Sequence, residues 1–427
     1  MPGAQVLLDL LYCSALAVGS PWCAWKLLTR RKIRAGLREK LGGVPRRSGP
    51  PCAWFHCVSV GEANLARELI ARFERRLPDC PVAVSCTTDT GRAALEKHLA
   101  GRDLFYYPFD LSPAVRKTFG RVRPRCIILI ELELWPNLLL TARDRGVPVV
   151  VINGRIEEPN FRRLSHVRFL VAPLLKTLRA ICVQDDVYAR RLVDLGAPPE
   201  RVLVTGNMKY DAVRTEIDPG HPACRAIRGL GPGPVVVGGC TWPGEDEILL
   251  RIHKEAAAAH PGLRLVLAPR HAERLPSVER LVEDAGFACR RLSTLKMHPG
   301  SGENVVVLVD TVGELDAVYA ASDIVFVGKS LTQHGGHNIL EPAALGKPVL
   351  FGPHTENFRD AAALLLDAAA AVKVDSEAGL REQITQFLAA PAAFAQLGTK
   401  AKAAVAGRKG ATERNLEVIE SIVASCA

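Results

Sequence analysis

The sequence lacks the residue patterns that hold structural zinc or pair as disulfides. Its twelve cysteines include no Cys-x-x-Cys pair, and no group of cysteines and histidines has the spacing of a zinc site. Several cysteines, such as Cys126 and Cys182, lie within apolar runs instead. We therefore expect small, buried, hydrophobic thiols in a reducing compartment and no disulfide framework.

Charged and aromatic residues are also few. Charged residues make up 23% of the chain and hydrophobic residues 48%, which excludes a disordered protein. The net charge of +10 favours anionic partners: nucleic acid, phospholipid or phosphorylated substrates. Aromatic residues are only 6% and no nucleic-acid-binding module is recognisable, so we predict that nucleic acid is not a partner. A length of 427 residues suggests two domains.

The N-terminus departs from globular composition. Residues 6–28 are mostly apolar, interrupted by Asp9, Pro21 and Lys26. The chain start carries Asp9 and no basic residue, which argues against a cleaved signal peptide. A basic cluster follows: Lys26, Arg30, Arg31, Lys32, Arg34, Arg38, Lys40, Arg46 and Arg47. We predict a membrane anchor over residues 1–28, which spans the bilayer or lies in its interface, with the rest cytoplasmic. The alternative is a hydrophobic helix packed on the protein itself.

Beyond residue 52 the chain alternates between apolar strands and helices. Strands are predicted at residues 53–58, 82–86, 125–130, 149–152, 180–183 and 202–204, and then at 235–238, 265–268, 305–309, 324–327 and 349–352. A stretch rich in proline and glycine separates the two series. This pattern predicts two doubly wound α/β domains, over residues 29–210 and 234–427, joined by a linker at 211–233.

The most informative stretch follows the predicted strand at 324–327. Gly335 and Gly336 permit a tight turn, and Asn338 can cap a helix that ends before Gly346. A strand, a glycine loop and a helix start together offer backbone N–H groups to a phosphate. Glu341, in the first helical turn, could bind two ribose hydroxyls. The alternative is an ordinary glycine-containing crossover with a well-placed cap.

Acidic residues in the first half also stand out. Glu131 and Glu133 follow a buried strand, where two acids are costly unless they are paired or used. Glu39 is the single acid within the basic run, in residues 36–42 (GLREKLG). From pattern alone Glu39 reads as a solvated helix residue, and Ser59 as a helix cap.

Several motifs together resemble one enzyme family. They are residues 56–62 (HCVSVGE), 131–137 (ELELWPN), 206–209 (GNMK), 269–271 (PRH), 335–341 (GGHNILE) and 352–358 (GPHTENF). This set is similar to the 3-deoxy-D-manno-octulosonic acid (Kdo) transferases of lipopolysaccharide assembly. The resemblance implies a GT-B fold, with two Rossmann-like domains facing a cleft. It also implies transfer of Kdo from CMP-Kdo to a lipid A precursor at the inner membrane, with inversion and without a metal or cofactor.

The resemblance also assigns roles to individual residues. Glu39 corresponds to the catalytic base, and Glu131 to a supporting acid. The acceptor side would include Arg38, Ser59, Gly61 and Glu62, and the donor side Arg270, His271, Gly313, Glu314, Gly335, Gly336, Asn338 and Glu341.

Three positions depart from the family pattern. Leu132 stands where threonine is usual, Trp242 where histidine is usual, and Lys329 where the family has a small residue. Trp242 removes a polar contact that the family pattern implies for the loop after Thr241, and Lys329 adds positive charge near the nucleotide. Two other functions remain open on the sequence: a GT-B enzyme that uses a UDP-sugar, and a non-enzymatic protein that binds anionic lipid.

Overall fold

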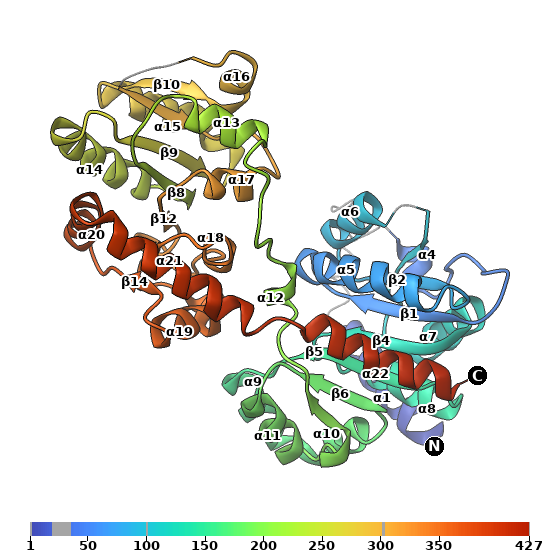
Figure 1. The fold of residues 1–427 in the computed structure, drawn as a ribbon. Coiled ribbons are helices and arrows are strands. Elements are labelled where there is room, and N and C mark those ends of the chain that lie inside the picture. Colours follow the sequence, from blue (N-terminus) through green and yellow to red (C-terminus); the bar gives the residue numbers. More distant parts are fainter. Residues whose placement is uncertain (1, 19–35, 100, 301–303, 427) are drawn as a thin grey trace. The chain divides into compact units, whose positions relative to one another are not determined.

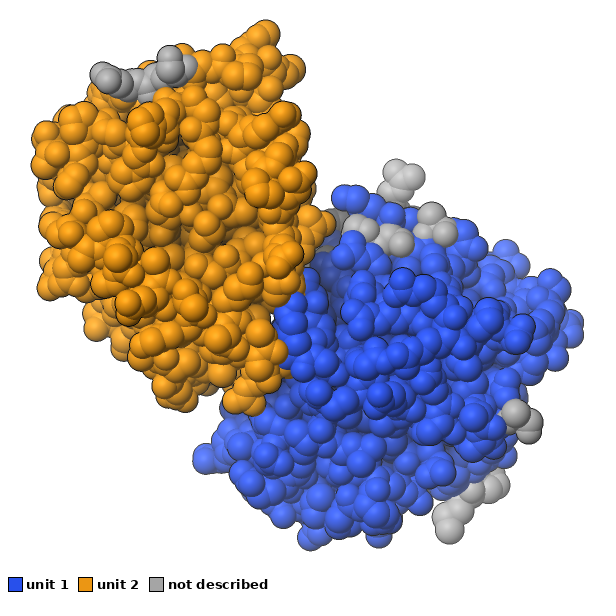
Figure 2. Space-filling view, in the orientation of Figure 1, with its two compact units in different colours: residues 1–212, 409–427 blue, residues 213–408 orange. Residues whose placement is uncertain are grey.

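The computed structural model describes residues 2–18, 36–99, 101–300 and 304–426. The chain forms two compact units, Met1–Ala212 with Lys409–Ala427, and Val213–Arg408 (Figure 2). Each unit is built on a seven-stranded parallel sheet (Figure 1). Cys126 and Cys182 are buried and free, as predicted.

The sheet of the first unit has the order β3-β2-β1-β4-β5-β6-β7. Its strands are β1 (Cys52–Cys57), β2 (Val82–Cys86), β3 (Asp103–Tyr106), β4 (Pro124–Ile130), β5 (Val149–Gly154), β6 (Ala180–Val183) and β7 (Val202–Val204). Its helices are α1 (Pro2–Val18), α4 (Leu37–Lys40), α5 (Val60–Arg76), α6 (Asp89–His98), α7 (Ser112–Val122), α8 (Pro136–Asp144), α9 (Glu158–His166), α10 (Arg168–Leu175), α11 (Asp186–Asp194), α12 (Lys209–Ala212) and α22 (Ala411–Ser425).

Helices cover both faces of this sheet. Successive side chains of a strand point to opposite faces. Phe55 of β1 packs into a core with α5, α6 and α22. Its neighbour Trp54 packs into a second core with α7, α8, α10 and α11. Burial on both faces explains why β1 reads as a continuous apolar run in the sequence.

The sheet of the second unit has the order β10-β11-β9-β8-β12-β13-β14. Its strands are β8 (Val235–Thr241), β9 (Arg264–Pro269), β10 (Ala288–Arg291), β11 (Val305–Leu308), β12 (Ile324–Val327), β13 (Val349–Phe351) and β14 (Ala371–Lys373). Its helices are α13 (Pro222–Arg228), α14 (Glu245–Ala259), α15 (Leu275–Asp284), α16 (Leu292–Met297), α17 (Leu315–Ala320), α18 (Leu340–Ala344), α19 (Arg359–Asp367), α20 (Glu377–Ala389) and α21 (Pro391–Ala406).

Both sheets have a point where the strand order reverses. In the first unit it lies between β1 and β4, and in the second between β8 and β12. Parallel strands end at the same edge of a sheet, and ligands of such folds bind at this switch point. The predicted site residues that follow these strands therefore gather at one edge of each unit.

The domain boundaries differ from those expected on the sequence. The stretch predicted as a linker contains α13, whose residues Ala223 and Ile227 are buried in the second unit. The last helix, α22, was assigned to the second domain but belongs to the first unit. Its residues Leu416 and Ile419 complete the core beside α5. The chain passes back to the first unit after Arg408, and no proline- and glycine-rich stretch marks this second passage in the sequence.

The helix α1 packs on the first unit through its polar side. Asp9 accepts hydrogen bonds from the backbone N–H of Ser112 (2.9 Å) and from Asn137 (3.0 Å), while Gln5 is buried. Four of its apolar side chains are exposed instead: Val6, Leu7, Leu10 and Leu11. None of the helices within the described ranges is long and apolar enough to cross a membrane. The rest of the predicted anchor, residues 19–28, and the basic residues from Lys26 to Arg34 lie outside the described residues.

The start of α22 depends on one carboxylate from a distant part of the chain. Asp211 accepts hydrogen bonds from the backbone N–H groups of Gly410 and Thr412, each at 2.6 Å. We expect Asp211→Ala to lower the free energy of unfolding of the first unit by about 1–2 kcal/mol, because two N–H groups of a helix start lose their acceptor. Urea denaturation measures this. The exposed Asp79 is the matched control, and equal losses in the two alanine variants would contradict the capping role.

Candidate active site

Glu39 lies at the carboxyl edge of the first sheet. Its carboxylate Oε2 accepts a hydrogen bond from the backbone N–H of Tyr106, at the end of β3 (2.7 Å). Gly36 allows the start of α4 to lie against the Tyr106 ring. Its φ is 67°, and a Cβ at this position would lie 2.0 Å from the ring. The Lys40 ammonium lies over the same ring, 4.6 Å from its centroid. The basic motif is thus held against the sheet, whereas the Arg38 side chain is exposed.

Arg92 of α6 is the partner of Glu39 that the sequence did not reveal. Its Nη1 lies 3.7 Å from Glu39 Oε2, and the two side chains are 21% and 23% exposed. That nitrogen is buried without a hydrogen-bond acceptor among the described residues. The other carboxylate oxygen of Glu39, Oε1, also has no partner in the described part of the chain. One oxygen is therefore anchored, and the second is available to a substrate.

Ser59 and Glu62 form a capping box at the start of α5. The Ser59 hydroxyl donates to Glu62 Oε1 (2.8 Å) and accepts from the Glu62 backbone N–H (3.3 Å). The Val58 backbone N–H donates to Glu62 Oε2 (2.7 Å). These contacts satisfy the helix start, in line with the structural reading of Ser59. A Cβ at Gly61 would meet only Ser59 Oγ, at 3.7 Å, so packing does not require glycine there.

Three acids gather beside the switch point of the first sheet. Glu131, directly after β4, has a φ of 65° and pairs with Arg155 (3.1 Å). Burial, together with the nearby carboxylates of Glu62 and Glu131, raises the pKa of Glu133 to about 7. A carboxyl group with a pKa near neutrality can both give and take a proton. The left-handed backbone of Glu131 costs roughly 1–3 kcal/mol, and such conformations occur often at functional sites.

Glu39 and Glu131 do not form a catalytic pair. Glu39 is anchored at the end of β3 and Glu131 follows β4, with β2 and β1 between these strands. At about 4.8 Å between neighbouring strands, the two strand ends are about 14 Å apart. The predicted supporting role of Glu131 therefore cannot involve direct contact with the Glu39 carboxylate.

In the second unit, one buried carboxylate organises the switch point. Glu245, the first residue of α14, accepts hydrogen bonds from the backbone N–H groups of Lys329, Ser330 and Leu331 at 2.8–3.0 Å. It also accepts from the N–H of Trp242 (2.9 Å). The loops that follow β8 and β12 are thereby joined. Sequence reasoning missed Glu245, since an acid in a first helical turn has many ordinary explanations.

The glycine pair of the donor loop is already engaged within the protein. The Gly335 N–H donates to Glu356 Oε2 (2.7 Å), and the Gly336 N–H donates to the Lys329 carbonyl (2.8 Å). Gly336 has a φ of 70°, and a Cβ there would lie 2.8 Å from the His354 carbonyl. These two glycines therefore shape the loop and do not offer their N–H groups to a phosphate. The amides of His337 and Asn338 have no acceptor among the described residues.

Trp242, in the loop after β8, and Lys329, in the loop after β12, contact each other. The Lys329 ammonium lies 4.8 Å from the centroid of the Trp242 ring, a cation–π distance. Trp242 Nε1 donates to His337 Nε2 (3.2 Å). The pKa of His337 is lowered to about 4, mainly by burial and further by the positive charges of Arg270 and Lys329. Its imidazole is therefore neutral at pH 7. His271 packs edge-on against Trp242, with ring centroids 5.2 Å apart.

Asn338 and Glu341 are joined at the start of α18. Asn338 Oδ1 accepts from the Leu340 N–H (3.1 Å), and its Nδ2 donates to Glu341 Oε1 (2.9 Å). Burial and the nearby carboxylate of Asp316 raise the pKa of Glu341 to about 7. Asn338 was predicted to cap this helix, but the N-cap position is Ile339, so the Asn338 side chain closes a turn just before the helix. The helix is shorter than expected, since it begins at Leu340 and ends at Ala344.

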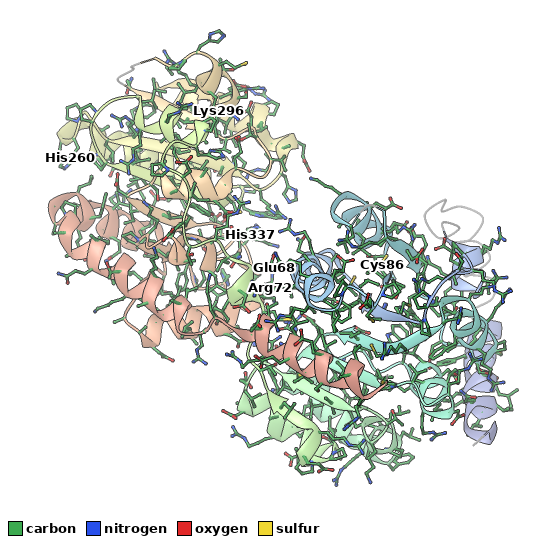
Figure 3. The ribbon with its side chains drawn as sticks, turned by 45° about the vertical axis from the view of Figure 1, so that its right-hand side comes forward. Glu68, Arg72, Cys86, His260, Lys296 and His337 are labelled. Atoms are coloured by element: carbon green, nitrogen blue, oxygen red, sulfur yellow. The ribbon has the colours of Figure 1, made fainter. Side chains whose placement is uncertain are left out.

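The remaining predicted donor residues lie in different surroundings. Arg270 is exposed and sits close enough to His337 and Glu341 to influence both pKa values. Glu314 is held by the Lys296 ammonium (2.7 Å), and Lys296 lies well apart from His337 (Figure 3). Gly313 has a φ of 86° and open space where a Cβ would lie. Arg270, His271, Asn338 and Glu341 are thus brought together, whereas the Glu314 carboxylate is occupied elsewhere.

Comparisons with known proteins identify the family. A family model described as 3-deoxy-D-manno-octulosonic-acid transferase (kdotransferase) matches residues 35–212. The chain is 32% identical to the 3-deoxy-D-manno-octulosonic acid transferase of Haemophilus influenzae, over 97% of this chain and 95% of that protein. It is 34% identical to the transferase of the same name from Bordetella pertussis, over 93% of this chain and 95% of that protein.

A solved structure supports the fold. UDP-GlcNAc 2-epimerase from Neisseria meningitidis, bound to UDP-GlcNAc, matches with a TM-score of 0.60 and 17% identity, over 86% of this chain and 99% of that chain. At this identity the likeness concerns the fold alone. The family is shown by the two relatives, which align along nearly their whole length: the chain belongs to the 3-deoxy-D-manno-octulosonic acid transferase family.

Proposed function

We propose that the chain is a GT-B glycosyltransferase that moves Kdo from CMP-Kdo to a lipid A precursor in lipopolysaccharide biosynthesis. Membership of the family supports the transferred sugar and the reaction class. The observation that carries the mechanism is the Glu39 carboxylate, anchored through one oxygen and open at the other. The same relatives disfavour the alternatives of a UDP-sugar enzyme and a non-enzymatic lipid binder.

Glu39 acts as the general base of this reaction. The Tyr106 N–H and the Arg92 guanidinium hold Oε2, so Oε1 can take the proton of the acceptor hydroxyl as that oxygen attacks the anomeric carbon. The bond to the CMP phosphate breaks on the opposite face, and a single displacement inverts the configuration. The proton ends on Glu39 and the electron pair on departing CMP. No protein nucleophile and no metal is needed.

Residues of the second unit hold the donor. Arg270 and Lys329 supply positive charge for the phosphate, and the free amides of His337 and Asn338 supply hydrogen bonds. Glu341 takes the ribose hydroxyls. Asn338 orients its carboxylate, since the Asn338 amide already donates to Oε1.

The exposed apolar side of α1 rests on the cytoplasmic face of the inner membrane. Its polar side is committed to α7 and α8 through Asp9 and Gln5, and a spanning orientation would have to break those contacts. Leu7, Leu10 and Leu11 would then enter the headgroup boundary, as in an interfacial helix. The basic residues that follow, including Arg38 and Lys40, would attract the acceptor's phosphates while its acyl chains stay in the bilayer.

Glu39→Gln tests the base. Glutamine preserves an acceptor for the Tyr106 N–H but cannot take a proton, so we expect kcat to fall by about 10²–10⁴-fold with the KM for CMP-Kdo unchanged. Steady-state release of CMP measures both. Glu96→Gln is the matched control, because Glu96 also binds Arg92 (2.7 Å) but is exposed. Near-normal turnover by Glu39→Gln, with loss of turnover in Glu133→Gln, would transfer the role to Glu133.

The ribose role of Glu341 predicts a dependence on pH. Hydroxyl donors favour the ionised carboxylate, so CMP binding should tighten as the pH rises through about 7 in the wild type and stay flat in Glu341→Gln. Calorimetric titration with CMP at a series of pH values measures this. Glu283→Gln, an exposed acid of the same unit, should keep the wild-type profile. A flat wild-type profile would remove Glu341 from the ribose site.

The raised pKa of Glu341 also predicts that the free energy of unfolding falls as the pH rises, whereas CMP binding tightens. The pKa of Glu341 is raised in the folded state, so the unfolded chain ionises first and the cost of burial grows from about pH 4.5 to 7. Glu341→Gln should therefore raise the free energy of unfolding by roughly 1–3 kcal/mol at pH 8 and leave it unchanged near pH 4. Urea denaturation at the two pH values measures this difference, and an equal change at both would contradict the assignment.

The interfacial position of α1 is tested by a double variant. Leu7→Asn with Leu10→Asn should weaken binding to vesicles that contain anionic phospholipid by tenfold or more, on the order of 1 kcal/mol or more for each leucine. Vesicle co-sedimentation measures the partition. Leu366→Asn is the control, since Leu366 is an exposed leucine of the other unit. Equal binding of all three proteins would refute the contact.

A further inference from the structure

Two loops of the second unit bring two imidazoles and a carboxylate to one point. His334 lies in the loop after β12, whereas His354 and Glu356 follow β13. One potential ligand atom from each of the three lies within 4.8 Å of the others. His334 and Glu356 are exposed and His354 is half-buried, so an ion from solvent can reach them. None of the three is proposed above to contact the donor or the acceptor, although Glu356 accepts a hydrogen bond from the Gly335 N–H of the same loop.

The spacing matches the edges of a metal coordination tetrahedron. Glu356 Oε1 lies 3.1 Å from His334 Nδ1 and 3.7 Å from His354 Nδ1. Zinc binds imidazole nitrogen and carboxylate oxygen at about 2.0–2.2 Å, which separates neighbouring ligands by about 3.3 Å. The two observed distances lie on either side of this value. The imidazole rings are neighbours, with centroids 3.9 Å apart. A modest rotation of the exposed His334 side chain would separate the two imidazole rings enough for an ion to bind between their nitrogens.

The surrounding backbone holds the carboxylate in place. The Gly335 N–H donates to Glu356 Oε2 (2.7 Å), which leaves Oε1 directed at the two imidazoles. The His354 N–H donates to the Ser330 carbonyl (3.0 Å), and the Asn357 N–H donates to the Gly335 carbonyl (2.9 Å). Such outer contacts orient ligands and strengthen metal sites. The two loops are therefore already set at the right distance before any ion binds.

We infer that His334, His354 and Glu356 form a binding site for a divalent transition-metal ion of the zinc class. Two imidazole nitrogens and one carboxylate oxygen suit this class better than Mg²⁺ or Ca²⁺, which prefer oxygen ligands. Three protein ligands leave a fourth position for water. The ion would tie the glycine loop to the loop after β13. The site is independent of the proposed transfer, whose chemistry proceeds without a metal.

Metal binding can be measured directly on the full-length chain, reduced and free of any affinity tag. Titration with Zn²⁺ against a chromophoric chelator should show one tightly bound ion per chain. His334→Ala, His354→Ala and Glu356→Gln should each weaken it by at least about tenfold. Glutamine at position 356 keeps an acceptor for the Gly335 N–H, so this variant separates loss of the ligand from loss of the fold. Circular dichroism checks that each variant is folded.

Two further measurements, on a control variant and on the Co²⁺ form, test which side chains bind the ion. Glu273→Gln is the matched control, because His271 and Glu273 form a histidine–carboxylate pair at 3.7 Å that belongs to no three-ligand cluster among the described residues, and this variant should bind Zn²⁺ as the wild type does. The absorption spectrum of the Co²⁺ form should lack the sulfur charge-transfer bands that cysteine ligands produce. Affinity unchanged in the three site variants, absence of a tight ion in the wild type, or a cysteine spectrum would overturn the assignment.

Discussion

One hydrogen bond, from the backbone N–H of Tyr106 to Glu39 Oε2, positions the proposed base. It fixes a carboxylate from a short helix, α4, to the end of a sheet strand. Because the bond comes from the backbone, the position of the carboxylate depends on the sheet and not on a mobile side chain. Gly36 permits this contact, since any side chain there would collide with the Tyr106 ring. A base must be held within hydrogen-bond reach of its proton, and this arrangement supplies that constraint.

The second unit uses protein carboxylates where a nucleotide-binding loop would otherwise leave amides free. Glu245 takes the N–H groups of residues 329–331, and Glu356 takes that of Gly335. These contacts hold the loop without a ligand, and the amides of His337 and Asn338 are among those that have no acceptor in the described part of the chain. In the proposed function, the positive side chains of Arg270 and Lys329 supply the charge that attracts the donor phosphate. The contact of Lys329 with Trp242 indicates that two unusual residues of this chain act together.

The interior of the fold was predictable from the sequence, whereas its edges were predicted only in part: the edge strand β7 was predicted at residues 202–204. Central strands such as β4 and β12 are apolar runs buried on both faces, which is a strong signal. The strands β10 and β14 were missed, because edge strands are partly exposed and carry polar residues such as Arg290 and Lys373. The return of the chain to the first unit at α22 was missed, because the core residues that α22 packs against lie far away in the sequence.

The candidate site divides in the same way. Asn338 and Glu341 were predicted from a local cap pattern, and the structure joins them by a hydrogen bond. Glu39 was identified by resemblance, since nothing local distinguishes it from a solvated acid. Arg92 and Glu245 left no signal, because their partners are 53 and 84–86 positions away, a separation that periodicity does not encode.

The most direct measurement is the product formed when the purified chain is incubated with CMP-Kdo and a lipid A precursor, and the lipid is analysed by mass spectrometry. The account predicts a lipid heavier by one or more Kdo residues, with stoichiometric release of CMP. An unmodified lipid, together with turnover of UDP-sugars by the same preparation, would contradict it.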